Sequence, residues 1–243
     1  MTLLDFFFRK SVFSILLLLA GTSLGFSATI TLRPVADTSL FQDQTNNNLG
    51  GELTIPVGAT DQLITNTTLL EVNRGLIKFA VAGAVPSNAT ITSVTLSLTV
   101  VQVPGKGPVD SIFGLRRMLR DWGEGNKRGI QFPEGASATA GEANWNVRFY
   151  PTLSWSAPGA AAPIDFTNAL STTNFVQRLG TYAFGPTSNL VADVQAWLKN
   201  PAADFGWLLR SENETTPLTN RPFCFKTKLP DKFPRRHVTR CNP

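Results

Sequence analysis

The sequence predicts an all-β fold, a single β-sandwich domain with one short helix near 188–199. The clearest sign is the stretch from Ile91 to Val103, where apolar and polar residues alternate as in a strand with one buried face. The 243 residues include 19 Gly and 16 Pro, which predicts many turns. The 17 Phe residues predict a substantial apolar interior, and a sandwich of about 200–250 residues can form one domain.

Residues 1–27 have the pattern of an export signal. Arg9 and Lys10 precede an apolar run from Val12 to Ala20, and small residues follow at positions 23–27. The run is shorter than the roughly 20 residues that a spanning helix needs. We therefore expect a secreted or cell-surface protein, with an uncleaved N-terminal anchor as the alternative and as the only predicted membrane contact.

Five short strands are expected in the first half of the chain, at 29–32, 35–40, 53–57, 74–81 and 91–103. Between the second and third lies a polar loop, 42–51, rich in Asn, Asp and Gly, which favour turns. A sixth strand is expected to place Phe113, Leu115 and Leu119 on one face. The opposite face is expected to carry Arg116, Met118, Arg120 and Trp122.

The second half is expected to be loop-like from 123 to 163, with Trp145 and Trp155 as anchors. A helix is predicted over 187–200, because apolar residues recur there every three or four positions and Asn200-Pro201 stops it. A last strand is expected at 205–210. Of the five tryptophans, Trp197 and Trp207 are predicted to belong to the core.

The charge distribution divides the chain into a nearly neutral body and a basic tail. Residues 221–243 hold seven basic side chains and one acid, which leaves 13 basic and 15 acidic side chains in the body, residues 28–220. The body is therefore not expected to bind nucleic acid. The only cysteines, Cys224 and Cys241, both lie in the tail, where an exported protein can join them by a disulfide.

The body carries no recognisable catalytic device, so we predict that the protein is not an enzyme. The only histidine is His237, in the tail, which excludes a Ser–His–Asp arrangement in the body. No His/Cys cluster has the spacing of a zinc site. Asp121 and Glu124 are the nearest candidate pair of carboxylates, and they leave a polysaccharide lyase or hydrolase as the second alternative.

A set of ordered motifs resembles the DNRLRE-type domain, a family grouped with carbohydrate-binding modules and associated with alginate-like polyuronates. The resemblance covers about residues 30–220 and implies a jelly-roll-like β-sandwich with a non-catalytic binding role. The motifs are Ala36-Asp37, Asn47-Asn48-Leu49-Gly50, Gly75-Leu76-Ile77-Lys78-Phe79, Ala89 to Leu96, Trp122-Gly123-Glu124-Gly125, Ala143-Asn144-Trp145, Val191 to Trp197 and Phe205-Gly206-Trp207-Leu208-Leu209.

The chain departs from the family pattern after Asn220-Arg221. Such domains close with a final alternating strand, whereas residues 221–243 are basic, rich in Pro and without a period of two. We interpret this segment as an aberrant tail produced by a frameshift. The sandwich is then expected to lack a strand and to leave one edge open.

A sugar site is expected to combine aromatic faces with polar side chains, and an acidic sugar adds a need for guanidinium groups, which bind carboxylates through two hydrogen bonds. Arg116, Arg120 and Trp122, followed by Lys127 and Arg128, fit this requirement. Trp145 and Trp155 are candidates to line a groove borne by loops. The structural alternative is a solvated basic face with Trp122 packed beneath a loop.

The leading hypothesis is therefore an exported, non-catalytic module that binds an acidic polysaccharide. The first alternative is a structural or adhesive cell-surface or matrix scaffold that recognises no sugar. No cofactor is expected, except that the oxygen donors Asp37, Asp43 and Asn47 form a candidate Ca²⁺ site. Capping of turns explains the same three residues.

Overall fold

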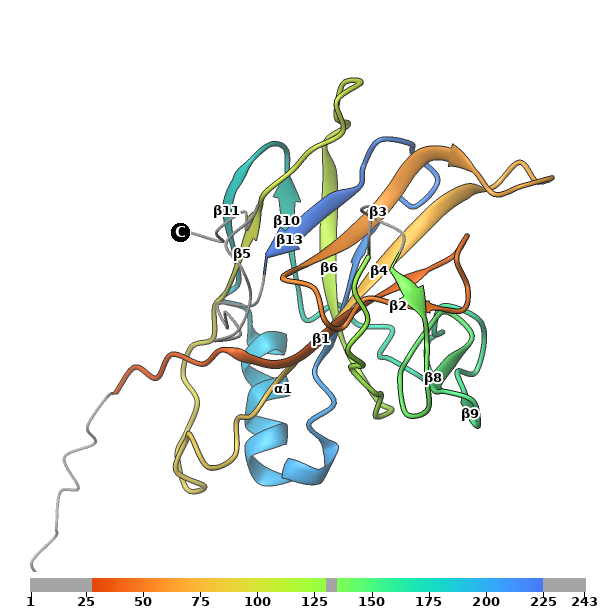
Figure 1. The fold of residues 1–243 in the computed structure, drawn as a ribbon. Coiled ribbons are helices and arrows are strands. Elements are labelled where there is room, and N and C mark those ends of the chain that lie inside the picture. The colour runs from red at the N-terminus through yellow and green to blue at the C-terminus, as the bar shows by residue number, and fades with distance from the viewer. Residues whose placement is uncertain (1–27, 130–134, 225–243) are drawn as a thin grey trace, which may run out of the picture.

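The computed structural model describes residues 28–129 and 135–224, and this part of the chain is an all-β protein with one α-helix (Figure 1), as predicted. The strands are β1 (Pro34–Phe41), β2 (Asn47–Asn48), β3 (Thr54–Leu63), β4 (Leu70–Phe79), β5 (Leu96–Val100), β6 (Ser111–Arg117), β7 (Ala136–Ser137), β8 (Val147–Phe149), β9 (Leu153–Ser154), β10 (Thr172–Val176), β11 (Gly180–Phe184), β12 (Trp207–Ser211) and β13 (Arg221–Cys224). The helices are α1 (Ser188–Lys199) and a 3₁₀ turn, η1 (Pro201–Ala203).

One antiparallel sheet of nine strands folds over to form the sandwich. Its strand order is β10-β6-β12-β4-β3-β13-β5-β11, with β1 paired to β4. The fold line is β3, which pairs with β13 through its first half and with β4 through its second. Gly58 stands at this corner with φ +110°, and a Cβ there would lie 2.7 Å from the Thr219 carbonyl oxygen. Only glycine fits such a bend, which lets one strand serve both halves.

The inner core lies between the two halves of the sheet and under α1. It gathers the inward side chains of the paired strands, including Phe113, Leu98 and Phe223. The alternation predicted over Ile91–Val103 is confirmed within β5, where Leu96, Leu98 and Val100 are buried while Ser97 is exposed, but residues 91–95 and 101–103 form no strand.

The predicted helix is confirmed. Trp197 on the helix and Trp207 on β12 both lie in the core, as expected. Thr187 caps α1 by accepting a hydrogen bond from the Leu190 amide. The rings of Trp197 and Trp207 meet edge to face at 4.4 Å between centroids. The Asp193 carboxylate accepts a hydrogen bond from Trp207 Nε1, which ties the helix to β12. No helix within the described ranges has the length and apolar character needed to cross a bilayer.

A second core covers the outer face of the sheet on the side of β4, β6 and β12. Leu40, Leu76 and Leu208 project outward there and are fully buried. The loops that follow β6 supply the cover, through Met118, Trp122, Trp145, Trp155 and Phe166. The segment 123–163 was predicted as loop-like. Its described residues, 123–129 and 135–163, form a packed layer in which the strands are the short pair β8–β9 and β7 of the pair β2–β7.

Several strand predictions were wrong. Residues 29–32 form no strand and lie ahead of β1, which itself begins at Pro34. The strand β6 ends at Arg117, so Leu119 does not share the face of Phe113 and is 37% exposed. The strands β10 and β11, which pair with β6 and β5, were not predicted, because they are only five residues long and mix polar with apolar positions.

The first four residues of the predicted tail are part of the sandwich. Arg221–Cys224 form β13, which pairs with β3 on one side and β5 on the other, so the expected open edge is filled at this place. Cys224 is disulfide-bonded. The rest of the basic tail with Cys241 and His237, and the predicted export signal, lie outside the described residues, and the frameshift stays a hypothesis.

Arg221 joins three segments beneath β13. Its side chain is fully buried, and its guanidinium donates hydrogen bonds to the backbone carbonyls of Val109, Gln177, Leu218 and Asn220 at 2.8–3.2 Å. Burial lowers the pKa of Arg221, while the charge of Asp110 acts in the opposite direction. A flat group with five donors is well suited to satisfy several carbonyls at once.

Replacing Arg221 by Met is expected to lower the free energy of unfolding by about 2–4 kcal/mol, because four backbone carbonyl groups lose the donor that a fully buried side chain supplies. Urea denaturation followed by tryptophan fluorescence, with the disulfide kept oxidised, measures this change. The matched control is Arg178→Met, at an exposed arginine, for which we expect a change within about 0.5 kcal/mol. Equal stability of the two variants would contradict the structural role of Arg221.

Candidate functional site

The three tryptophans predicted to face a sugar are buried. Trp122, Trp145 and Trp155 are only 4%, 6% and 5% exposed, and all three belong to the outer core. The indole N–H of Trp122 donates to the Phe205 carbonyl, and that of Trp155 to the Asn144 carbonyl, each at 2.9 Å. Stacking of a pyranose on these rings is therefore excluded, and this part of the predicted site was wrong.

The predicted arginine face is divided by the end of β6. Arg116 lies on the strand, and its guanidinium donates hydrogen bonds to the Glu212 carboxylate and the Asn168 carbonyl. Arg120 follows in the bend after the strand and is exposed. It forms no side-chain hydrogen bond or ion pair within the described ranges. The two arginines thus differ in kind, since one is part of the protein's own packing and the other faces solvent.

Arg116 belongs to a network of ion pairs on the outer sheet face. Arg74 binds Glu214 through two hydrogen bonds of 2.8 Å, and Arg210 contacts the same carboxylate at 2.9 Å. Burial lowers the pKa of Arg210, and the Glu214 charge opposes this effect. Arg74 also donates to the carbonyls of Gly159 and Ala160 and lies 5.3 Å from the Trp145 ring centroid. These contacts fasten the loop layer to the sheet.

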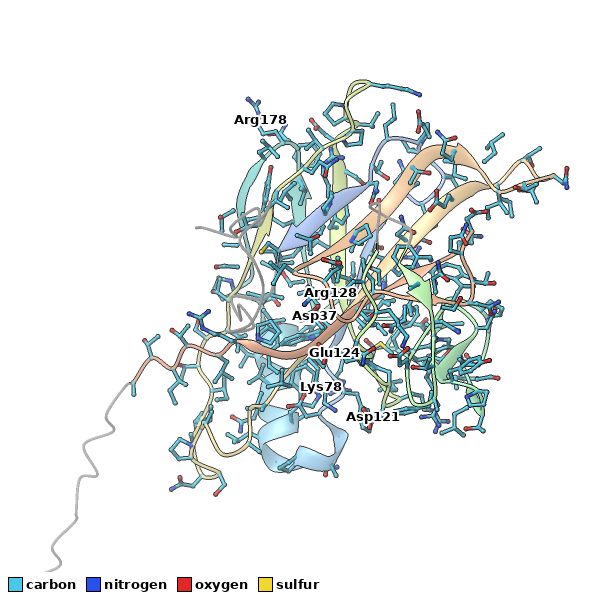
Figure 2. All side chains as sticks on the ribbon, viewed as in Figure 1. Asp37, Lys78, Asp121, Glu124, Arg128 and Arg178 are labelled. Atoms are coloured by element: carbon cyan, nitrogen blue, oxygen red, sulfur yellow. The ribbon has the colours of Figure 1, made fainter. Side chains whose placement is uncertain are left out.

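Lys127 also serves the loop layer. Its ammonium group donates to the Thr139 hydroxyl at 2.8 Å and lies 3.5 Å from a Glu142 carboxylate oxygen. Arg128 is exposed, and Figure 2 shows it at the opposite end of the 121–128 segment from Asp121. Of the predicted basic residues, Arg116 and Lys127 are therefore held within the protein.

The Asn48 side chain is the hub that holds the polar loop 47–52 against this layer. Its amide nitrogen lies 2.8 Å from the carbonyl oxygens of Glu124 and Ala143 and 3.1 Å from the Thr38 hydroxyl. Its oxygen accepts from the Gly50 amide at 2.9 Å. Asn48 is fully buried, so each bond satisfies a group that water does not reach.

Glycines let the backbones of the two loops touch. A Cβ on Gly50 would lie 2.0 Å from the Glu124 carbonyl oxygen, and one on Gly123 would lie 1.7 Å from that of Gly141. Gly125 has φ +79° and leaves room for the Asn48 amide. The motifs Asn47-Asn48-Leu49-Gly50 and Trp122-Gly123-Glu124-Gly125 are thus two halves of one interlock.

The candidate calcium ligands occupy unlike environments. Asp37 is fully buried, and its backbone amide donates to a Glu124 carboxylate oxygen. Asp43 is exposed and accepts a hydrogen bond from Gln44, while Asn47 lies in β2 opposite Ser137. Residues 28–129 and 135–224 contain no group of three or more His, Cys, Asp or Glu side chains placed to hold a metal.

A different basic surface lies at the end of the molecule where β4 meets the segment after β6, and we call it the loop-end surface. Figure 2 shows Lys78 and Asp121 together there, joined by an ion pair of 3.1 Å. Arg148 donates to the Asp121 carbonyl at 3.1 Å, and Arg120 is the neighbour of Asp121 in the chain. Three cations thus accompany the Asp121 carboxylate, and the charge of Lys78 also acts on the buried Asp204 carboxyl.

Aromatic side chains border these cations. Lys78 Nζ lies 5.9 Å from the centroid of the half-buried Phe205 ring, and the Arg148 guanidinium lies 5.6 Å from that of Phe149. Tyr150 follows and is 40% exposed. We define the loop-end surface as Lys78, Arg120, Asp121, Arg148, Phe149, Tyr150 and Phe205.

Sequence reasoning included Arg120 but missed Lys78, Arg148 and Tyr150. The signal for Lys78 was a charged residue in the otherwise apolar run Gly75-Leu76-Ile77-Lys78-Phe79. Neither a protein-family model nor a curated protein matches the chain. The likeness to the DNRLRE-type domain therefore rests on its motifs, which the structure places in the loop interlock, the strands and the helix.

Asn48→Ala is expected to lower the free energy of unfolding by about 2–4 kcal/mol, because it leaves buried carbonyl and amide groups without their partner. Thermal and urea unfolding, followed by near-UV circular dichroism, measure the loss. Asn46→Ala makes the same chemical change at an exposed position of the same loop, and we expect it to cost less than about 1 kcal/mol. A similar cost for both variants would show that Asn48 is not the hub.

Proposed function

We propose that the protein is an exported, non-catalytic module that binds an acidic polysaccharide through the loop-end surface. The observation that carries the proposal is the excess of cations beside aromatic side chains at one end of a rigid sandwich. Guanidinium and ammonium groups suit uronate carboxylates, and the apolar faces of sugar rings pack on aromatic side chains. The site differs from the one expected from the sequence, because exposed Tyr150 replaces the buried tryptophans as the aromatic contact.

The loop carboxylates support a binding role over catalysis, because the protein itself uses them. Asp121 pairs with Lys78, and Glu142 accepts from the amides of Asn126 and Thr139. Asp165 accepts from the Ser156 hydroxyl and from the Ala161 amide. A glycosidase needs two carboxyl groups facing a substrate, one of them as an acid. The carboxylates named here already stabilise turns.

A structural or adhesive scaffold is the competing function, and the burial of Trp122, Trp145 and Trp155 favours it. A sugar module without a flat indole on its surface must rely on charge and on smaller rings. The two functions differ in a simple way, since only the module binds a soluble polysaccharide. Trp122→Ala does not separate them, because removing a buried tryptophan is expected to destabilise the fold itself.

Affinity electrophoresis of the exported domain in gels that contain alginate, pectate, a neutral glucan or no glycan tests the proposal. We expect selective retardation by the two uronates, weakened by added salt. Arg120→Ala is expected to raise the apparent dissociation constant about fivefold to tenfold, since it removes an exposed cation without breaking a described contact. Release of unsaturated product or new reducing ends would instead indicate an enzyme.

The matched control is Arg178→Ala, which removes an exposed arginine from the end of the molecule opposite Asp121 in Figure 2. Its retardation should equal that of the wild-type protein. Unchanged migration of the folded wild-type protein in every gel would overturn the module and favour the scaffold. An equal loss in both arginine variants would point to non-specific attraction by net charge.

A further inference from the structure

A buried asparagine at the fold line of the sheet has no hydrogen-bond partner within the part of the chain that the structure describes. Asn73 of β4 is fully buried, and neither its amide oxygen nor its amide nitrogen is paired there. A primary amide is both a donor and an acceptor of hydrogen bonds. Buried amides in folded proteins are paired with protein groups or with ordered water, because leaving them unpaired costs free energy.

Asn73 faces the corner at which β3 passes from one half of the sheet to the other. Its partner in the ladder with β3 is Gly58, the corner residue, and such partners point their Cβ atoms to the same face, about 5 Å apart. Alternation along β4 makes this the inner face, since Ile77 belongs to the inner core and a Cβ on Gly75 would meet Ile55.

The segment 219–220 closes the inner face over this corner. A Cβ on Gly58 would lie 2.7 Å from the Thr219 carbonyl oxygen and 3.0 Å from the Asn220 Cα atom. The Asn220 backbone amide donates to the Ala59 carbonyl at 2.9 Å, which fixes the segment against β3. Asn220 is 8% exposed, and its side-chain oxygen has no hydrogen-bond partner among the described residues. Unpaired polar atoms of two asparagines thus adjoin the place where residue 58 carries no side chain.

The group that pairs these atoms must be small, neutral and both a donor and an acceptor. The oxygens of Asn73 and Asn220 need a donor, and the Asn73 nitrogen needs an acceptor. A cation is disfavoured, because the Arg221 guanidinium already lies 3.0 Å from the Asn220 carbonyl oxygen. An anion is disfavoured, because it cannot donate to the two unpaired oxygens. We propose that about one or two ordered water molecules are bound at this corner, between Asn73 and Asn220.

The surroundings of the corner give such water a route to solvent. Asn220 also lines a hollow of about 260 Å³ that opens between the β3–β4 hairpin and the loop after β5. Thr60 and Gln102 line the same hollow, so its wall is partly polar. Water bound behind Asn220 therefore exchanges with solvent through this hollow, without opening of the apolar inner core.

Nuclear magnetic resonance of the exported protein tests the water site. We expect nuclear Overhauser cross-peaks between water and the Asn73 side-chain amide protons, with the sign of a long-lived internal water. Oxygen-17 relaxation dispersion counts such waters and does not register exchanging hydroxyl protons. Asn73→Leu replaces the amide by an apolar side chain of similar shape, and we expect it to lower the count by about one or two. The matched control is Asn46→Leu, the same change at an exposed position, for which the count should equal that of the wild type.

Two results would overturn the proposal. One is the absence of a water cross-peak at the Asn73 amide of the folded wild-type protein, and this measurement decides the question even if Asn73→Leu does not fold. The other is an oxygen-17 count that folded Asn73→Leu leaves unchanged. Asn73 is not part of the loop-end surface, so either result is independent of polysaccharide binding.

Discussion

The structure depends on the interlock between the loop 47–52 and the segment 123–143. A sheet with apolar side chains on both faces needs a second layer, and the described residues of that layer have almost no regular secondary structure. Its backbone polar groups must then find other partners. The Asn48 side chain supplies three of these hydrogen bonds, with the Glu124 and Ala143 carbonyls and the Gly50 amide, and Gly50, Gly123 and Gly125 allow the backbones to approach closely enough for them.

This layer explains both the fate of the tryptophans and the error in predicting it. Helix α1 was predictable because its cap, its apolar spacing and its stop are local signals in one segment. A tryptophan in a loop gives no such signal, since its role is decided by what packs above it. Trp145 is buried because Arg74 lies over its ring and Gly159 lies against another part of the ring. A Cβ on residue 159 would collide with that ring. Those contacts join residues far apart in sequence.

The last strand, β13, was also not predictable from its local sequence. Arg221–Cys224 are four residues with a proline among them, which predicts no strand from local preference. Tertiary contacts decide the outcome, because Phe223 fills the inner core and meets Phe113 edge to face at 5.2 Å. Pairing with β3 and β5 then fixes the register. A strand of four residues is too short to show a periodicity in its sequence, although all four residues are buried.

Which cations can meet a ligand follows from how the fold distributes its acids. Glu212 and Glu214 come directly after β12 and reach the arginines of three neighbouring strand positions, Arg74, Arg116 and Arg210. These charged side chains of the outer sheet face are therefore paired with one another. At the loop end Asp121 forms an ion pair with Lys78, whose charge also acts on the buried Asp204 carboxyl, and Glu124, the next acid along the chain, accepts from the Asp37 amide. The exposed Arg120 lies beside this pair in the chain, and it is the cation to which the acidic polysaccharide proposed above would supply a carboxylate.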